Sequence, residues 1–567
     1  MSKPSPEAAY SPEEQQRLEP FVSNLERPVF VLRNLPQEVA GALFSRYSRS
    51  AKSVRRLLLD EFLENDESGL KDLKVGAAAG GIDLERAQDF FERILAGYGD
   101  DSIGELGGVH IACEDITNMA AKVLEDARIG ISPLEKSSRY VSFAEKRDGQ
   151  YRFLRDPDIM ASAHAETYEN ACNSLFETYS TLIDPMMEWV KEKWPQEAGE
   201  DDRAYRASTK AKALDSLRGL LPAATLTNVG LFGNGRAFEF LMIKMLSHEL
   251  AEIRELAGSM KAELDTEIPS MVSRASRDDK NGGATIGFYE ASRGAVREFA
   301  AEVLGDTELD PAERPGVELL SYREDGEDEV LAALLYEETH LSESQIKVAV
   351  AGVSKERRKA FFERLGELRG NRRHRLNRGL EATEYEFDIA CDFGAYRDLQ
   401  RHRVLSQQRQ RISTLHGYDV PDQIKDAGHE AAYRSAMDNA ALAYEQIAAN
   451  LPEQAQYVVP FGYRMRFRMR MNLREAFHLI ELRSTPQGHP SYRHIAQEMY
   501  ERIKEVHPLA ASAMRFVDLS NRDEMERRES EQRTAKKLAK LEKKHELERY
   551  PTNRRTDGRI ASSIRYQ

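Results

Sequence analysis

Arg401, His402 and Arg403 form the short motif of this chain that is best suited to chemistry. Guanidinium groups bind phosphates and carboxylates through planar pairs of hydrogen bonds. They also stabilise negative charge that develops in a water-poor site. A lone Arg-His-Arg in an arginine-rich chain is more often a solvated surface. The motif therefore predicts an anion-binding site only if a second element joins it.

A second polar motif supplies that element on a predicted helix over residues 472–483. The residues of this motif that could contact a ligand are Asn472, Arg474, His478 and Arg483. Residues three and four apart on a helix lie on the same side. The spacing of four between Arg474 and His478 predicts a shared face, and we expect Asn472, at the start of the helix, to contact the ligand together with them.

The chain also contains an internal repeat. The markers of the first copy are Glu105, Ser137-Ser138-Arg139-Tyr140, Pro222 and Asn234-Gly235-Arg236. Those of the second copy are Glu381, Arg401-His402-Arg403, Pro460 and Asn472-Leu473-Arg474. In both copies the proline precedes the asparagine by twelve residues. Ile111-Ala112-Cys113 and Ile389-Ala390-Cys391 echo one another too, in a register that differs by a few residues.

Together these motifs resemble the flavin-dependent thymidylate synthase family. That family carries Arg-His-Arg, then Ser-x-Arg-Tyr with a glutamate two residues before the serine, and later Asn-x-Arg near Leu-Arg. The second copy keeps Arg-His-Arg but reads Arg411-Ile412-Ser413-Thr414 where Ser-x-Arg-Tyr is expected. The first copy keeps Ser-x-Arg-Tyr but reads Ala127-Arg128-Ile129 where Arg-His-Arg is expected.

Two further positions show the same complementary loss. Arg483 of the second copy corresponds to Met245, and Arg218 of the first copy corresponds to Gln456. The resemblance implies sites between subunits, where Arg-His-Arg of one faces Ser-x-Arg of another. We therefore expect composite sites built from both repeats, in a homodimer that forms a pseudo-tetramer.

The resemblance also implies FAD as the cofactor, with NADPH and methylenetetrahydrofolate as co-substrates and dUMP or a related pyrimidine nucleotide as the acceptor of a one-carbon unit. Arg401, His402 and Arg403 are the implied catalytic residues. The implied flavin-binding residues are these three with Glu381, Ser406, Asn472, Arg474 and His478. The implied nucleotide-binding residues are Glu135, Ser137, Arg139, Arg218 and Arg483.

The sequence departs from the family pattern at positions that, by the resemblance, lie near the pyrimidine ring of the nucleotide. A glutamine expected three residues before Arg401 is Asp398. The asparagine of the family's Asn-Glu pair is Leu134 in one copy and Gln408 in the other. The acceptor can therefore be a pyrimidine other than dUMP.

Two other functions remain open. One is a non-catalytic relative that binds flavin or nucleotide, or acts as a scaffold. The other is nucleic-acid binding by the basic stretches 370–378, 463–474 and 551–567. The acidic net charge of −14 argues against general nucleic-acid binding. We interpret the alternating run 463–470 as an amphipathic core segment, and 372–375 as a surface patch or a phosphate-contacting loop.

The bulk composition, with 41% hydrophobic and 31% charged residues, is that of a globular protein. No apolar run has the length of a membrane span, and the first residues lack the apolar core of a signal peptide. Only three cysteines occur, without a C-x-x-C pair, so we expect a reducing, cytoplasmic location, buried cysteines and no metal site.

Helical periodicity predicts a helix-rich α+β fold with two tandem domains of the family's α/β type. The predicted helices are 85–98, 113–127, 164–193, 236–264, 343–369, 428–450 and 472–483, and the predicted strands are 140–143, 317–322 and 384–389. The predicted units are a polar N-terminal segment (1–30), a first repeat (31–300, with an inserted helical pair at about 145–210), a second repeat (315–515), and a charged helix with a basic tail (520–567).

Overall fold

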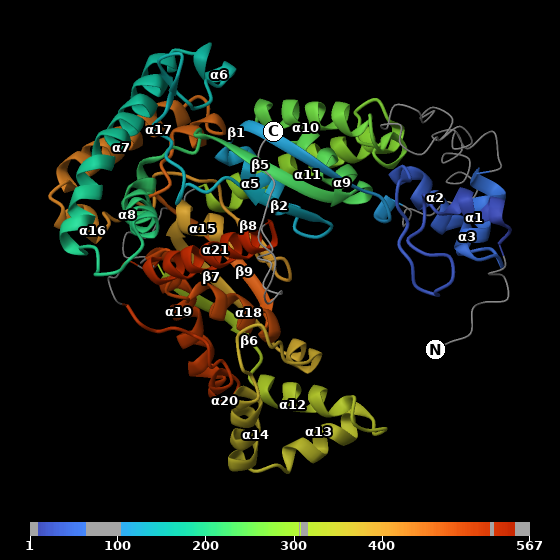
Figure 1. Cartoon of the computed structure of the whole chain (residues 1–567). Coiled ribbons are helices and arrows are strands. Elements are labelled where there is room, and N and C mark those ends of the chain that lie inside the picture. Colours follow the sequence, from blue (N-terminus) through green and yellow to red (C-terminus); the bar gives the residue numbers. More distant parts are fainter. Residues whose placement is uncertain are drawn as a thin grey trace, which may run out of the picture.

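The computed structural model describes residues 10–63, 104–305, 307, 316–521, 525 and 527–549. Helices dominate, and two antiparallel sheets lie at the centre of the molecule (Figure 1). This arrangement agrees with the predicted helix-rich α+β class. The first sheet has the strand order β1–β5–β2, from Gly108–Thr117, Leu226–Asn234 and Ile131–Glu135. The second has the order β6–β7–β9–β8, from Gly316–Tyr322, Glu384–Asp392, Arg464–Asn472 and Ser406–Arg409.

The two repeats share one order of elements. In the first repeat the order is β1, α5 (Asn118–Asp126), β2, α7 (Ala165–Lys193), β5, α9 (Gly235–Leu246) and α10 (Ala251–Leu264). In the second it is β7, α15 (Phe393–Leu399), β8, α17 (Glu430–Ala448), β9, α18 (Leu473–Arg483) and α19 (Pro490–Val506). Within the predicted insertion, α7 thus has the counterpart α17, while α8 (Asp202–Leu217) and the β3–β4 hairpin (Lys146–Arg147, Gln150–Tyr151) are additional.

Strand pairing fixes the alignment of the repeats. Ser132 lies opposite Phe232, and Ser406 lies opposite Arg470. Phe232 and Arg470 each stand two residues before the asparagine that caps the following helix. The side chain of Asn234 accepts a hydrogen bond from the N–H of Ala237 at 2.8 Å, and that of Asn472 accepts one from the N–H of Glu475 at 2.9 Å. Ser132 and Ser406 therefore occupy equivalent positions in the two repeats.

The cysteine echo, by contrast, has no structural counterpart. Cys113 lies opposite Val229 and Cys391 opposite Met465, which are not equivalent positions. A β-bulge after Cys113, with Asp115 in the left-handed region at φ 53°, adds a residue to β1 and changes its register. Both cysteines are buried and free, as is Cys172.

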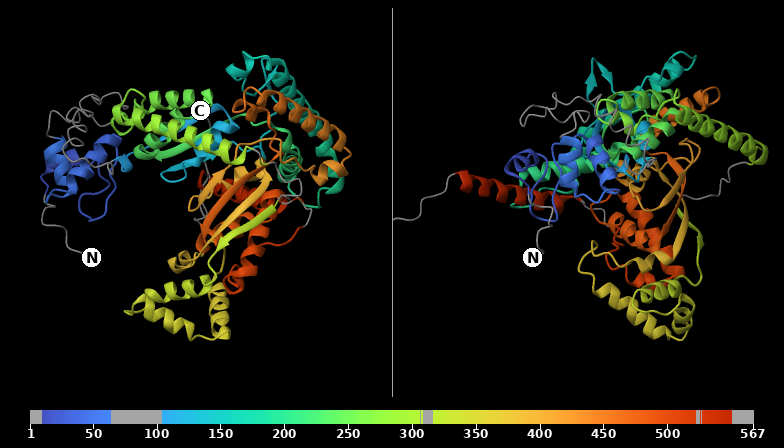
Figure 2. Two further views of the ribbon diagram at one scale, coloured as in Figure 1. Left: turned by 180° about the vertical axis from the view of Figure 1, so that it is seen from behind. Right: turned by 90° about the vertical axis from the view of Figure 1, so that its right-hand side faces the viewer.

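The two repeats meet around their matching prolines. Pro222 and Pro460 form an antiparallel bridge. The N–H of Ala223 donates to the carbonyl of Val459, and the N–H of Phe461 donates to the carbonyl of Leu221, both at 2.9 Å. This reciprocal pattern indicates an approximate twofold relation between the repeats, and α7 packs against α17 across it. The view from behind shows the second sheet with α18 and α19 on its far side (Figure 2).

Several predicted elements differ from the structure. Residues 140–143 form a turn and no strand, and the helix predicted from 113 begins only at Asn118 because β1 runs to Thr117. The helices predicted at 236–264 and 343–369 are each broken in two, the second into α13 (Glu343–Ala351) and α14 (Lys355–Glu367). The strands β6 and β7 and the helices α7, α17 and α18 are confirmed. Residues 85–98 and 551–567 lie outside the described residues.

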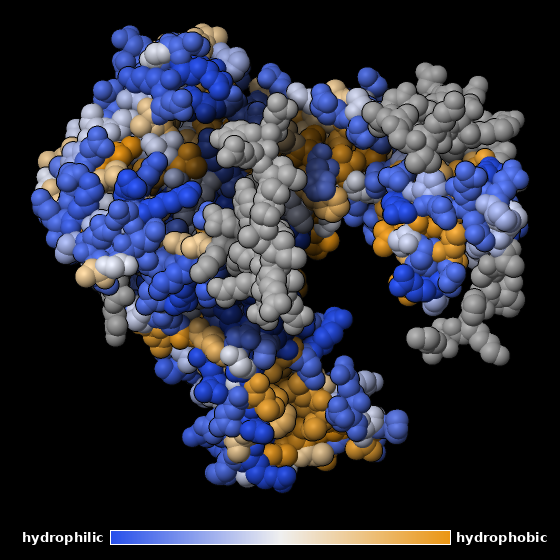
Figure 3. Space-filling model, viewed as in Figure 1, coloured by the Kyte–Doolittle hydropathy of each residue, from blue (hydrophilic) through white to orange (hydrophobic). Residues whose placement is uncertain are grey.

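The remaining elements surround this core. The N-terminal segment predicted to be polar contains α1, and Leu18, Phe21 and Val22 are buried there. Apolar surface gathers where α12 and α13 lie (Figure 3), and the exposed side chains of that region include Tyr336 and Val348. The charged helix predicted at the C-terminal end is α21, which extends away from the body (Figure 2). The helices not yet given are α1 (Pro12–Leu18), α2 (Gln37–Tyr47), α3 (Val54–Leu57), η1 (Leu58–Leu63), α6 (Pro157–Met160), η4 (Arg218–Leu220), η5 (Pro269–Met271), α11 (Lys280–Leu304), α12 (Gly326–Tyr336), η6 (Arg378–Ala382), α16 (Asp422–Asp426), η7 (Gln454–Val458), α20 (Pro508–Ser512) and α21 (Arg528–Arg549).

None of the helices in the described part of the chain combines the length and the apolar character that a membrane crossing needs.

Candidate functional site

The candidate site forms where the Arg-His-Arg segment of the second repeat meets the first repeat. Glu135, the last residue of β2, is fully buried at its side chain and faces three basic groups. Arg397 donates to it at 2.7 Å, and Arg401 and Lys122 donate to it at 3.1 Å each. Burial alone would raise the pKa of Glu135, but Arg397, Lys122 and Arg401 lower it to about 2. Glu135 is therefore ionised and joins the two repeats.

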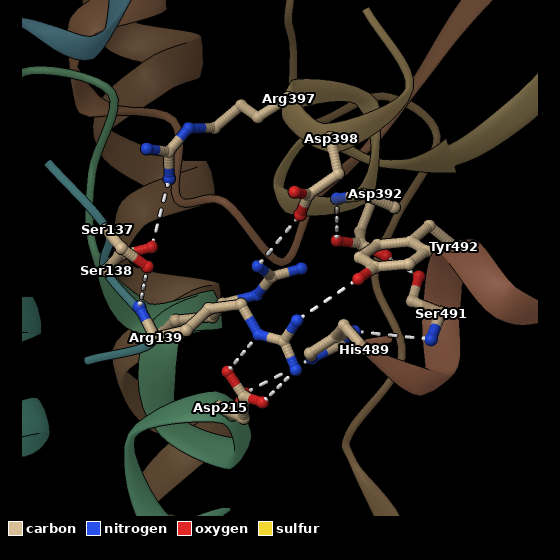
Figure 4. A network of polar contacts seen from close by, with 12 residues as sticks. Ser137, Ser138, Arg139, Asp215, Asp392, Arg397, Asp398, His489, Ser491 and Tyr492 are labelled. Carbon is tan, nitrogen blue, oxygen red and sulfur yellow. Dashed lines mark hydrogen bonds and ion pairs between the residues drawn. The ribbon is translucent and has the colours of Figure 1, made fainter. Parts of the chain in front are cut away.

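The Ser-x-Arg-Tyr segment of the first repeat lies beside this junction (Figure 4). Arg139 forms a two-pronged ion pair with Asp215 of α8, with the Nε–Oδ1 distance at 2.7 Å, and it donates to the Tyr492 hydroxyl of α19 at 3.1 Å. Ser137 accepts from the backbone N–H of Arg139 at 3.3 Å. The guanidinium predicted to bind a nucleotide phosphate is thus held by a carboxylate of the same chain.

Asp398 lies between two more arginines of the predicted set. Its Oδ2 is 3.5 Å from Nη1 of Arg218, and its Oδ1 is 3.8 Å from Nη1 of Arg483. Burial alone would raise the pKa of Asp398, but Arg218, Arg483 and neighbouring arginines lower it below its ordinary value. Among the described residues, Nε and Nη2 of Arg218 are buried without a hydrogen-bond partner.

His402 is the buried member of the Arg-His-Arg motif and connects it to α18. Nε–H of Arg483 donates to Nε2 of His402 at 3.0 Å, so the ring proton lies on Nδ1, which is 2.9 Å from Glu475. His478 contacts the same carboxylate at 3.3 Å. Burial lowers the pKa of His402 to about 4 against the opposing effect of Glu475, so the imidazole is neutral near pH 7.

His402, Glu475 and His478 also form a group whose geometry suits a metal ion, because their ligand atoms lie within 4.8 Å of one another. The Arg483 guanidinium that donates to His402 opposes a second cation there. None of the sequence motifs marks Glu475, although it stands three residues before His478 on the same helix.

The other predicted flavin-binding residues lie towards the surface. Arg403 and Ser406 are exposed, and Arg474 pairs with Glu381 at 3.1 Å. The first repeat has the matching pair, Arg236 with Glu105 at 2.8 Å. Asn472 uses its side chain to cap α18. A small basic cavity of about 10 Å³ lies beside this group and is lined by Arg369, Arg372, Arg375, Leu376, Leu380, Arg474, Phe477 and His478.

The position that twofold symmetry makes equivalent to the candidate site has a different composition. Arg411, which stands where Ser-x-Arg-Tyr would begin, pairs with Glu249 at 3.1 Å and with Glu453 at 3.2 Å. Arg297 of α11 contacts the same two carboxylates. This second position holds an ion-pair network between the repeats. Among the described residues, the predicted motifs converge at the candidate site instead.

The alternating basic run forms β9, an inner strand of the second sheet. Met465, Phe467, Met469 and Met471 are buried, which confirms the amphipathic core segment. The intervening arginines face carboxylates: Arg466 pairs with Asp388 at 2.9 Å, and the others pair with Asp419, Glu386 and Glu384. Their charge is therefore compensated by neighbouring carboxylates, which argues against a nucleic-acid-binding stripe.

Comparison with known proteins identifies two matching segments, one in each repeat. The Thy1 family model, described as thymidylate synthase complementing protein, matches residues 47–270 and 318–509. A "UPF0159 protein" of Chlamydia muridarum is 44% identical over 524 residues, covering 92% of this chain and 97% of that protein. A "UPF0159 protein" of Thermoplasma acidophilum is 35% identical over 506 residues, covering 84% of this chain and 95% of that protein. A "Flavin-dependent thymidylate synthase" of Saccharolobus solfataricus is 32% identical over 140 residues, covering 23% of this chain and 53% of that protein.

Proposed function

Because the chain belongs to the Thy1 family of thymidylate synthase complementing proteins, we propose that it is a flavin-dependent enzyme of the thymidylate synthase type. It transfers a one-carbon unit from methylenetetrahydrofolate to dUMP or a related pyrimidine nucleotide. FAD is its cofactor and NADPH its reductant. The site is composite, with Arg-His-Arg from the second repeat and Ser-x-Arg from the first.

One observation carries this proposal: Arg397 and Arg401 of the second repeat share the buried carboxylate of Glu135 from the first. The two half-motifs that each repeat retains therefore adjoin within one chain. Decay of an unused duplicate would not bring the retained halves together. A buried charge network of this kind is costly to maintain unless its geometry is needed.

The residues present fit a bound flavin and an anionic nucleotide. The exposed guanidinium of Arg403 suits the diphosphate of FAD, whereas the cavity of about 10 Å³ beside Arg474 has room for one water molecule only. When bound, reduced flavin supplies the reducing electrons for the transfer. Neutral His402, fixed by Arg483 and Glu475, orients the Arg-His-Arg segment, and Arg401 stabilises negative charge on the ligand next to it.

We further propose a homodimer that forms a pseudo-tetramer. Arg403 and Ser406 lie on the surface, so a second chain would be needed to enclose a flavin there. Exposed apolar side chains on or next to the open face of the first sheet, Ile129, Leu134 and Phe232, suit a subunit contact. Light scattering after size-exclusion chromatography tests this, and a monomer at micromolar concentration would contradict it.

The test of the function is the visible absorption spectrum of the purified protein before and after dUMP is added. We expect a flavin spectrum that shifts with dUMP, and dUMP-dependent oxidation of the reduced flavin. Arg403→Ala should abolish flavin binding or turnover, whereas Arg533→Ala on the exposed face of α21 should change neither. Wild-type turnover in Arg403→Ala, or a protein that cannot be reconstituted with FAD, would favour the scaffold alternative.

A further inference from the structure

The segment that leads into α21 brings an additional arginine to the turn that carries the Ser-x-Arg-Tyr motif. Cζ of Arg527 lies 4.0 Å from the centroid of the Tyr140 ring. Tyr140 and Ser137 belong to one turn, in which the N–H of Tyr140 donates to the carbonyl of Ser137 at 3.3 Å. The matched family segments end at residue 509, so Arg527 belongs to a part of the chain outside them.

Residues on both sides of Arg527 fix it against the first repeat. Met525 is buried in one apolar cluster with Tyr205 of α8. Arg528 donates to Glu200, just before α8, at 2.9 Å. α21 itself packs along α8, the helix that has no counterpart in the second repeat. The position of Arg527 over the Ser-x-Arg-Tyr turn is therefore set by the packing of this C-terminal segment.

The Arg527 guanidinium has an unsatisfied donor. Its Nε is buried and has no hydrogen-bond partner among the described residues. Burial and the neighbouring Arg139 lower the pKa of Arg527 to about 9, and Glu531, one turn further along α21, opposes this shift only in part. The group is therefore still charged near pH 7, and burying an unpaired charged donor destabilises a protein. Such a group beside a binding motif indicates an acceptor that arrives with a ligand.

The guanidinium of Arg139, by contrast, is already occupied by partners within the chain. Its Nε and Nη2 donate to the carboxylate of Asp215, and its Nη1 donates to the Tyr492 hydroxyl at 3.1 Å (Figure 4). The carbonyl of Gln487 lies 3.4 Å from Nη1 as well. Of these two adjacent arginines, Arg527 is thus the one with an unpaired donor.

We propose that Arg527 binds the phosphate group of the nucleotide substrate, as a residue that the C-terminal segment adds to the site. This inference rests on the proposed function and deepens it, because it assigns the phosphate to a donor outside the family motifs. The planar edge of a guanidinium matches phosphate oxygens in pairs, and stacking on an aromatic ring leaves that edge available. Ser137 retains a hydroxyl proton for the same phosphate, because its oxygen accepts from the N–H of Arg139.

The test compares dUMP with deoxyuridine, which lacks the phosphate, on the wild-type flavoprotein and on Arg527→Met. Methionine retains an unbranched side chain over Tyr140 but carries no charge. Titration calorimetry should show that the substitution weakens dUMP binding about ten- to a hundredfold, the range for a hydrogen bond to a charged group, and leaves deoxyuridine binding unchanged. Arg533→Met is the matched control, because it makes the same change in an exposed pair with Glu529 on α21 and should leave both affinities unchanged.

Thermal unfolding separates a ligand-binding role from a structural one. Without ligand, Arg527→Met should unfold at a temperature no lower than the wild type, because its buried Nε has no hydrogen bond to lose. With dUMP, the rise in the unfolding temperature should be smaller in the variant, since a weaker ligand stabilises the folded state less. Arg527→Lys, which keeps a positive charge, should recover part of the preference for dUMP over deoxyuridine.

The other outcomes have distinct meanings. An unchanged ratio of dUMP to deoxyuridine affinity in Arg527→Met would overturn the inference. A lower unfolding temperature beside that result would make Arg527 a structural contact, and weaker binding of methylenetetrahydrofolate beside it would make the anion a folate carboxylate. Equal binding of dUMP and deoxyuridine by the wild type would overturn the inference and leave the proposed function in place. Wild-type flavoprotein that binds neither ligand would overturn the proposed function itself, and the inference with it.

Discussion

Replacing Glu135 with Gln tests whether the charge network between the repeats stabilises the fold. The Glu135 side chain has no exposed surface and faces Arg397, Lys122 and Arg401. A carboxyl pKa that falls from 4.5 to about 2 corresponds to about 3 kcal/mol, at about 1.4 kcal/mol for each pKa unit. Breaking a buried pair by removing one partner costs about 3–5 kcal/mol, so the two magnitudes agree.

The pH dependence gives this prediction a second, independent signature. The folded pKa of Glu135 lies below its unfolded value, so its contribution is complete well above pH 4.5 and is lost as the pH falls towards 2. We therefore expect Glu135→Gln to lower the free energy of unfolding by about 3 kcal/mol at pH 7 and by about half of that at pH 3. Equilibrium urea unfolding followed by circular dichroism measures both.

The matched control is Glu529→Gln, which makes the same change in an exposed pair with Arg533 on α21. Exposed pairs contribute little, so the control should unfold as the wild type does. A Glu135→Gln protein that is as stable as the wild type would refute the reasoning. So would a stability difference that stays constant down to pH 3.

Three further predictions concern other parts of the same framework. Burial lowers the pKa of His402 to about 4, so its imidazole should remain neutral at pH 5.5 in nuclear magnetic resonance titrations. Because this pKa lies below the unfolded value, the stability that His402 contributes should be lost as the pH falls from 6.5 towards 4. A titration midpoint near pH 6.5 would contradict the burial argument. Arg411→Ala should leave flavin content and the dUMP response unchanged, because Arg411 lies at the other symmetry-related position; loss of either would mean that this place is a working site. Gly219→Ala should destabilise the protein, because a Cβ there would clash with the hydroxyl of buried Tyr433. Gly258→Ala, on an open face of α10, should instead stabilise the protein by up to about 1 kcal/mol. Equal thermal midpoints for the two variants would contradict this prediction.

The parts of the fold that the sequence predicted well are those with a regular pattern. α7 and α17 carry sustained helical periodicity, and β7 a short β-rich run. The prediction failed at residues 113–117 because the β-bulge between Cys113 and Ile116 interrupts strand alternation. The apolar spacing across that bulge imitates a helix, so β1 was joined to α5.

At the site, the sequence predicted which motifs meet but not how their charges are compensated. The motif predicts that Arg139 binds a phosphate, whereas in the structure its guanidinium forms an ion pair with Asp215. Asp215 belongs to α8, an element without a counterpart in the second repeat, so no motif marked it. Glu475 was not predicted for a related reason. It accepts a hydrogen bond from His402, which lies on another segment of the chain.

The bridge between Pro222 and Pro460 also has a consequence for how the protein responds to dilution. When two halves of a site belong to separate chains, the fraction assembled falls as the protein concentration falls. Here both halves are tethered in one polypeptide, so their encounter is intramolecular and is governed by an effective concentration, which reaches the millimolar range for short flexible tethers. The junction of Glu135 with Arg397 and Arg401 therefore forms equally well in a scarce protein and in an abundant one.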